Sequence, residues 1–254
     1  TADADGTIAI GYQAGTAITS GQANVLIGFE SGKAITDGDY SVGVGYQTLK
    51  AQNKSGDAGN TAVGFKAGIA VTSGNHNVIV GRTAGFTANT MSGSVLIGAE
   101  AGKLVTTSHD CIAIGRLAMG GATTTGDNNI AIGATAGAAI DGGNYNTFLG
   151  FRAGKVTTAA SSLVIIGVEA AQANMTSAAD GTIAIGASAL AALTTGARNT
   201  AVGYQVLDAL PDGSDNTAIG YNALGAANSS DADHNTAIGV NAGDVITDGY
   251  QNTI

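Results

Sequence analysis

The chain has 254 residues, of which 40 are glycine and only one is proline, and 11% of its residues are charged. Collagen needs glycine at every third position with much proline, and disordered chains are poor in aliphatic residues and rich in charge, so this composition excludes both classes. The formal net charge of −9 argues against nucleic acid and anionic membranes as partners, because both select basic surfaces. The lone Cys111 excludes an intrachain disulfide framework, and no run of 18 apolar residues predicts membrane insertion.

A five-residue motif recurs along the whole chain. It reads Asn-Thr-Ala-Ile-Gly at 216–220 and at 235–239, and close variants precede it. The motif ends in glycine fourteen times, at steps of 17 to 19 residues, which is the period of a solenoid repeat. The predicted turn glycines are Gly11, Gly28, Gly45, Gly64, Gly81, Gly98, Gly115, Gly133, Gly150, Gly167, Gly186, Gly203, Gly220 and Gly239.

The three residues before each motif glycine form the predicted strands, from 8–10, 25–27 and 42–44 through to 236–238. An aliphatic residue directly precedes every motif glycine, and Ile, Val or Thr stands three residues before it. These two columns share one face of a strand because side chains alternate, and β-branching favours strands. We expect this face to form the coil interior. The predicted core residues are Ile10, Ile27, Val63, Ile114, Ile132, Ile185, Ile219 and Ile238.

The middle residue of each predicted strand points the other way and is mostly small and apolar, as at Ala9. A strand with one solvated face would carry polar residues there, so this strand is predicted to be buried on both faces and to need a partner. On the return path, alanine prevails three residues after the motif glycine. Aliphatic residues such as Ile18 and Ile140 stand seven residues after it. These columns predict a second short strand in each coil.

The motif glycine is predicted to occupy a left-handed or closely approached turn position. A second glycine stands four residues later in eight coils, and none of these coils precedes a longer step. The longer steps follow Leu49, Met119, Ala171 or Leu224 at that position. We expect these bulkier turns to accommodate the extra residues, as in a short helical turn.

Two strands per coil predict an all-β fold, a parallel β-roll or solenoid of 17–19-residue coils that forms a single array of about fourteen repeats over residues 1–254. The strand that is apolar on both faces predicts self-association, and closed rotational symmetry is the usual form of self-association. We therefore expect a homotrimeric fibre. Because the sequence starts and stops within its repeat, we expect it to be truncated at both ends from a longer fibre.

Longer motifs carry a resemblance to known families. They are NTAIGYNAL at 216–224, NTAVGYQVL at 199–207 and GTIAIGYQAG at 6–15. They resemble the head repeats of trimeric autotransporter adhesins, and more closely the repeats of phage tail fibres that end in an endosialidase-type chaperone. The resemblance implies a left-handed parallel β-roll, three chains to a fibre, and attachment to a cell surface. It places the protein outside the cell, on a cell surface or on a virion, with a surface receptor or glycan as a further partner.

Some polar columns invite a chemical interpretation. The asparagines that open the motif, such as Asn24 and Asn60, could bind ions, but we favour a ladder that satisfies backbone groups in the turns. The histidines lack the spacing of metal ligands; they are His76, His109 and His234. Three glutamates share the column two residues after the motif glycine but lie many coils apart, unlike the paired carboxylates of glycosidases; they are Glu30, Glu100 and Glu169.

The sequence therefore predicts a structural fibre segment, the shaft or head of a trimeric attachment protein, with no catalytic residue, metal or cofactor. Two alternatives stay open. One is a polysaccharide-degrading enzyme of the tailspike type, which needs clustered acids. The other is an ice-binding solenoid, which needs a flat, exposed threonine array. Threonine does recur at the first position of the predicted strand, at Thr61, Thr147, Thr200, Thr217, Thr236 and Thr253, but Val and Ile fill that column elsewhere.

Overall fold

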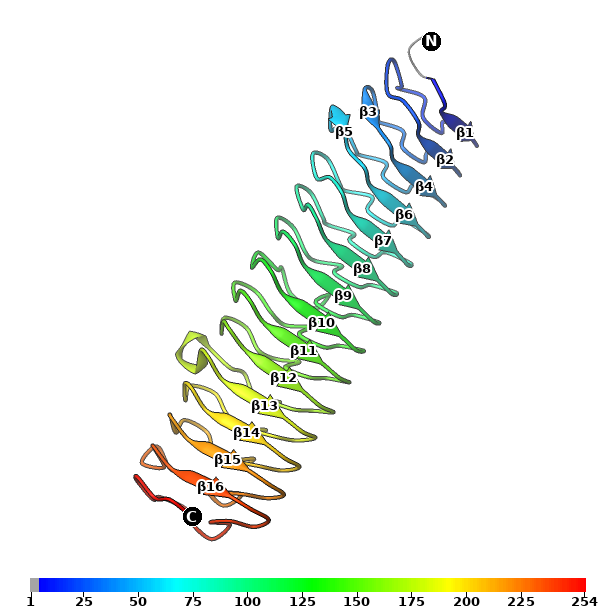
Figure 1. The fold of residues 1–254 in the computed structure, drawn as a ribbon. Coiled ribbons are helices and arrows are strands. Elements are labelled where there is room, and N and C mark those ends of the chain that lie inside the picture. The colour runs from blue at the N-terminus through cyan, green and yellow to red at the C-terminus, as the bar shows by residue number, and fades with distance from the viewer. Residues whose placement is uncertain (1–4) are drawn as a thin grey trace. The chain divides into compact units, whose positions relative to one another are not determined.

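The computed structural model describes residues 5–254, and it is a parallel β-solenoid of about fourteen coils of about 17 residues (Figure 1). The chain divides into two compact units, Thr1–Asn128 and Asn129–Ile254. Each unit contains seven three-residue motif strands, and each strand ends directly before a motif glycine. The predicted all-β solenoid is therefore confirmed, while the handedness of the coil and the number of chains in the assembly stay predictions.

In the first unit the motif strands pair in parallel, each with the next along the chain, and two further two-residue strands pair with each other in the loops. The motif strands are β1 (Ile8–Ile10), β2 (Val25–Ile27), β4 (Val42–Val44), β6 (Thr61–Val63), β7 (Val78–Val80), β8 (Val95–Ile97) and β9 (Ile112–Ile114). The loop strands are β3 (Gly38–Asp39) and β5 (Gly56–Asp57).

In the second unit the motif strands pair in the same way. They are β10 (Ile130–Ile132), β11 (Thr147–Leu149), β12 (Val164–Ile166), β13 (Ile183–Ile185), β14 (Thr200–Val202), β15 (Thr217–Ile219) and β16 (Thr236–Ile238). A short 3-10 helix, η1 (Ser177–Ala179), lies in one of the steps of 19 residues, where the turn carries Ala171. A helical turn thus occurs in this longer step, but the described residues contain none in the longer steps that follow Leu49, Met119 and Leu224, so the prediction holds for one of the four steps.

The faces of the motif strands are the reverse of the prediction. From β2 onward the middle residue of the strand points into the coil and is buried, as at Leu26 and Phe148, whereas Ile10 is 58% exposed and Ile238 is 61% exposed. The residues predicted as the interior core are all half-buried or exposed on the outer face of the strand; they are Ile10, Ile27, Val63, Ile114, Ile132, Ile185, Ile219 and Ile238. Alternation shows only that the two sets of residues lie on opposite faces; it does not show which face lies inside.

The return path explains which face lies inside. Residues three and seven positions after the motif glycine are buried within the coil, as at Ala67 and Val71. They already fill most of a thin interior, and the space that remains accepts one strand residue, which is usually alanine. The larger β-branched residues are therefore left on the outer face of the strand.

The predicted second strand is absent from the described return paths, which consist of turns instead. Residues two positions after the motif glycine have φ between 52° and 61°, as at Gln13 and Glu30, and those four positions after it are left-handed as well, with φ of 57° at Gly15 and 46° at Leu49. Each turn closes with bonds over three residues, such as the Ile18 amide donating to the Gly15 carbonyl at 3.1 Å. Strand geometry cannot include these repeated left-handed residues, which is why the return path forms no strand.

The glycine four positions after the motif glycine makes room for large interior side chains. A Cβ on Gly154 would lie 2.2 Å from the Phe148 ring, and one on Gly32 would lie 2.6 Å from the Leu26 side chain. In some coils with a small strand residue, as at Ala201, the turn carries a buried leucine, Leu207, instead. Where both positions are small, as at Ala131 and Gly137, a large side chain of the next coil, Phe148, lies against the turn and fills the interior.

All fourteen motif glycines have φ between 128° and 148°, a region that side chains rarely adopt. Space is restricted as well. A Cβ on Gly28 would lie 2.2 Å from the carbonyl oxygen of Gly45 in the next coil, and one on Gly220 would lie 2.2 Å from that of Gly239. Backbone conformation and close backbone approach thus both require glycine at these corners.

Candidate interaction surface

The outer strand face is an apolar surface that the chain's own coils leave partly uncovered. We define it as the residues one and three positions before each motif glycine. Because the strands pair in register, aliphatic residues of neighbouring strands lie opposite one another, with Ile8 opposite Val25 and Ile10 opposite Ile27. The row nearest the glycine is aliphatic in every coil, and its members range from half-buried to exposed, as at Ile219 with 39% exposure. Each unit thus carries a continuous, partly exposed aliphatic strip, and large strips of this kind are typical of interaction surfaces.

Aromatic rings continue this strip at the position directly after the motif glycine. In the first unit Tyr12, Phe29, Tyr46 and Phe65 stack in succession, with ring centroids 5.2, 5.2 and 5.3 Å apart. In the second unit Tyr204 and Tyr221 stack at 5.7 Å. The faces of these rings are covered by the neighbouring rings of the row. Stacking on sugar rings needs a free ring face, so these rows do not favour it.

Ion pairs line the position two residues after the motif glycine. The carboxylate of Glu30 accepts from Lys33 Nζ and Lys50 Nζ at 2.7 Å each, and from Gln47 Nε2 at 2.7 Å. The hydrogen bond from Lys33, followed by those from Lys50 and Gln47, lowers the pKa of Glu30 to about 2. Glu30 is therefore an ionised structural group at neutral pH.

The other two glutamates of that column make similar contacts. Glu100 pairs with Lys103 at 3.2 Å and with Arg82, and the Lys103 hydrogen bond is the main cause of its lowered pKa. Glu169 accepts from Arg152 Nη1 at 2.8 Å. The structure thus surrounds each of the three with basic or amide partners and does not bring them together as a catalytic pair. Absence of catalysis stays a prediction.

The asparagine column forms the buried ladder that the sequence favoured. Asn60 Nδ2 donates to the Gly74 carbonyl at 2.8 Å within its own coil, and Asn60 Oδ1 accepts from the Asn77 amide of the next coil at 3.0 Å. Asn146 repeats the pattern in the second unit, donating to Ala160 O at 2.9 Å and accepting from the Leu163 amide at 3.0 Å. Both side chains are fully buried, so the ladder satisfies turn and strand backbone groups.

The histidines lie apart in the turns. His76 Nε2 is 3.2 Å from Asp57, and His234 Nε2 is 3.8 Å from Asp215, which also accepts two bonds from Arg198 at 2.7 Å. The Arg198 bonds are the main reason that the pKa of Asp215 is lowered. Among residues 5–254 no cluster of three or more His, Cys, Asp or Glu side chains could hold a metal ion.

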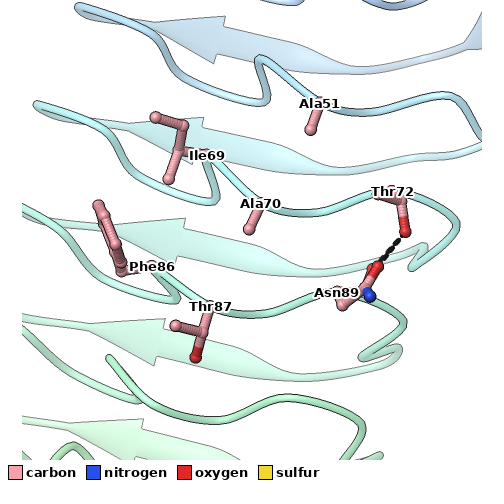
Figure 2. A pocket seen from close by; sticks show the side chains of 7 residues that line it. All are labelled: Ala51, Ile69, Ala70, Thr72, Phe86, Thr87 and Asn89. Atoms are coloured by element: carbon pink, nitrogen blue, oxygen red, sulfur yellow. Dashed lines mark hydrogen bonds between the residues drawn. The ribbon is translucent and has the colours of Figure 1, made fainter.

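A groove on the return side of the first unit was not predicted from the sequence. Its cavity volume is about 550 Å³. Its lining, here called the return groove, consists of Ala51, Ile69, Ala70, Thr72, Phe86, Thr87 and Asn89. Figure 2 shows these side chains on the segments that run in front of the strands, with Ile69 and Phe86 on one side and Thr72 and Asn89 on the other. One signal could have found it, because Phe86 is the only aromatic residue five positions after a motif glycine.

The described residues contain no helix long and apolar enough to cross a membrane. No known family model matches the chain, and no curated protein is significantly similar to it.

Proposed function

We propose that this chain is a structural fibre segment, the shaft or head of a homotrimeric attachment protein on a cell surface or virion, such as a phage tail fibre or an adhesin. In this proposal the coils wind left-handed, and three chains pack their outer strand faces together along a common axis. The segment spaces and presents a receptor-binding part, and it has no catalytic role.

The outer strand face is the observation that carries the proposal. Two side chains per coil lie on it, and the one beside the motif glycine is Ile, Val or Leu throughout. Complete burial of such a side chain is worth about 1.5–3 kcal/mol, and roughly half of that is still available where the residue is half-exposed. Summed over successive coils, this term favours a partner that covers the whole strip.

The spacing of the outer row supports a second copy of this chain as the partner. Parallel strands in a sheet are about 4.8 Å apart, so the outer row repeats at that spacing along each unit. A partner must present apolar groups at the same spacing to fill the strip evenly, and a second copy of this chain does so by identity. Closed rotational symmetry then limits the assembly to a defined number of chains.

Charge on the outer strand face tests the proposal. Ile219→Glu should leave a folded chain, because a side chain that is 39% exposed in the single chain can reach solvent. In a trimer three buried carboxylates would meet, and the assembly should dissociate. Sedimentation velocity measures the mass, and circular dichroism measures the strand content.

Ala192→Glu is the matched control, because Ala192 is a half-buried residue on a return segment of the same unit. It should leave the trimer intact. A wild-type protein that sediments as a folded monomer, or an Ile219→Glu variant that stays trimeric, contradicts the proposal.

Ice binding is a second candidate that one observation favours. Thr200, Thr217 and Thr236 lie opposite one another on the outer strand face of successive strands, and Thr253 bridges to Thr236 in the same row. An ice-recrystallisation assay with wild-type protein and a Thr217→Val variant tests it. Inhibition that the variant abolishes would support ice binding over the fibre role.

A further inference from the structure

The return groove combines an apolar surface with a polar margin. Its floor is formed by Ala51, Ala70 and Thr87, and Ile69 and Phe86 stand on one side of it (Figure 2). At about 550 Å³ the groove lies within the range of about 300–1,000 Å³ that small-molecule sites occupy. It is therefore large enough for one or two sugar-sized rings.

The polar margin presents an amide group to the ligand. The Thr72 hydroxyl lies within hydrogen-bond distance of Asn89 Oδ1 and is 3.2 Å from the Asn89 carbonyl oxygen. This contact directs the amide oxygen toward Thr72 and leaves Nδ2 on the other side, as Figure 2 shows. Within residues 5–254 no acceptor lies within hydrogen-bond distance of Asn89 Nδ2, and the side chain is exposed. Its two N–H groups are thus available to hydroxyl oxygens of a ligand.

The charges beside the groove are already compensated. Lys50 directly precedes Ala51, but its ammonium lies 2.7 Å from Glu30. Lys103, whose carbonyl accepts from the Thr87 hydroxyl at 3.1 Å, has its ammonium 3.2 Å from Glu100. Neither of these two lysines is therefore unpaired and available to an acidic ligand, and the chain as a whole carries a net charge of −9. The electrostatics therefore favour a neutral ligand.

We propose that the return groove binds a neutral oligosaccharide. One pyranose ring lies with its apolar C–H face against Phe86 and the alanine floor, and its hydroxyl groups accept from Asn89 Nδ2. A pyranose has this combination of one apolar face and a polar rim, whereas an aliphatic ligand would leave the amide unpaired. The inference rests on the proposed attachment role, because a fibre that recognises surface glycans needs such sites on the side that the trimer axis leaves free.

The experiment is a binding screen with immobilised neutral oligosaccharides, including maltohexaose and chitohexaose, and with oligogalacturonate as the acidic counterpart. Wild-type protein should bind at least one neutral glycan and not the acidic one. Phe86→Ala should weaken that binding on the order of tenfold, because it removes the ring contact. Asn89→Ala should weaken it by roughly five- to tenfold, because it removes the amide donors.

Tyr145→Ala is the matched control, since Tyr145 is an exposed aromatic residue in a turn of the other unit and should not affect glycan binding. Circular dichroism of each variant separates loss of binding from loss of fold. No neutral glycan bound by wild-type protein, or binding unchanged in Phe86→Ala, overturns the inference.

Sedimentation of the same samples distinguishes this inference from the proposed function. A trimer that binds no neutral glycan overturns only the groove, and a monomer that binds one overturns only the trimeric fibre. If Phe86→Ala dissociates the assembly, the groove is a contact between chains and the glycan proposal is wrong.

Discussion

The two faces of the motif strands vary in opposite ways. On the inner face the strand residue ranges from Gly43 through Ala131 to Leu26 and Phe148, and turn residues or side chains of neighbouring coils fill the space that small residues leave. On the outer face the residue beside the motif glycine is an aliphatic side chain of nearly constant size in all fourteen coils. The interior can vary because adjacent positions of the same chain compensate. Because the outer row is constant in size, its side chains form an even surface. Packing against a partner requires such an even surface, whereas contact with water does not.

The largest loss of stability is expected from substitution of a motif glycine, which forms the corner after each motif strand. Gly220→Val should cost more than about 3 kcal/mol, because a backbone at φ 137° strains any side chain and the new Cβ would lie 2.2 Å from the Gly239 carbonyl oxygen. Thermal and denaturant unfolding measure the change. Gly142→Val is the control, since a Cβ there meets nothing within 4 Å. Equal stability of the two variants would show that the corner does not constrain the fold.

Removing an inner ring should have the next largest effect. Phe148 is fully buried between Gly137 and Gly154, so Phe148→Ala should destabilise the chain by about 3–5 kcal/mol through lost transfer energy and a cavity. Phe151→Ala removes the same ring from an exposed position that is three residues away, and should cost much less in a single chain. If a trimer covers Phe151, the losses of stability in Phe148→Ala and Phe151→Ala should become similar. Comparing the two variants therefore also tests assembly.

Removing one amide of the buried ladder should have a smaller effect. Asn146→Ala leaves the Ala160 carbonyl and the Leu163 amide without their bonds, which costs about 1–3 kcal/mol where such groups stay buried. Asn144→Ala is the control, because its side chain donates to the Gly142 carbonyl at an exposed site. Chemical denaturation compares the two variants. If Asn144→Ala lowered the free energy of unfolding more than Asn146→Ala does, the ladder would not be a main source of stability.

The smallest effect is expected from acid. Because the pKa of Glu30 is lowered to about 2 from an ordinary value of 4.5, its contribution to stability is present above about pH 4.5 and is lost as the pH falls toward 2. Glu30→Gln should flatten the decline of the melting temperature over that interval. A wild-type and a variant curve of the same shape would show that the Lys33 and Lys50 contacts do not stabilise the fold.

Much of the fold followed from periodicity. The fourteen three-residue strands, their parallel order and the corner glycines are all visible in the spacing of the motif, because a coil that stacks on its own copies repeats every constraint. The inner and outer faces were not predictable, since both are apolar and alternation treats them alike. Which face lies inside depends on the space that the return path leaves, because residues such as Ala67 and Val71 already fill much of the interior. Left-handed residues such as Gln13 and Leu49 carry no sequence signal of their own, so the return path was predicted as a strand.

The candidate sites divide in a similar way. The asparagine ladder could be predicted because a buried amide at a turn has few other uses, and the separation of the three glutamates followed from their coil numbers. The return groove was not predicted, because Phe86 is its one sequence signal and the space itself depends on small side chains in two adjacent coils. Ala51 and Ala70 leave the space that Phe86 borders, and no short motif encodes that combination.

Because the strands pair in register, the chain can be lengthened or shortened by whole coils. Each motif position pairs with its own counterpart, so Ile183 lies opposite Thr200 and Thr200 lies opposite Thr217. Deleting residues 200–216 would join Asn199 to Thr217 and recreate the Asn-Thr junction that the deletion removes. The strand that begins at Thr217 could then dock on β13 with leucines still facing one another inside, because Leu190 and Leu224 occupy equivalent turns. Recombination between repeats could therefore change the reach of the protein in increments of about 4.8 Å without a new fold at any step.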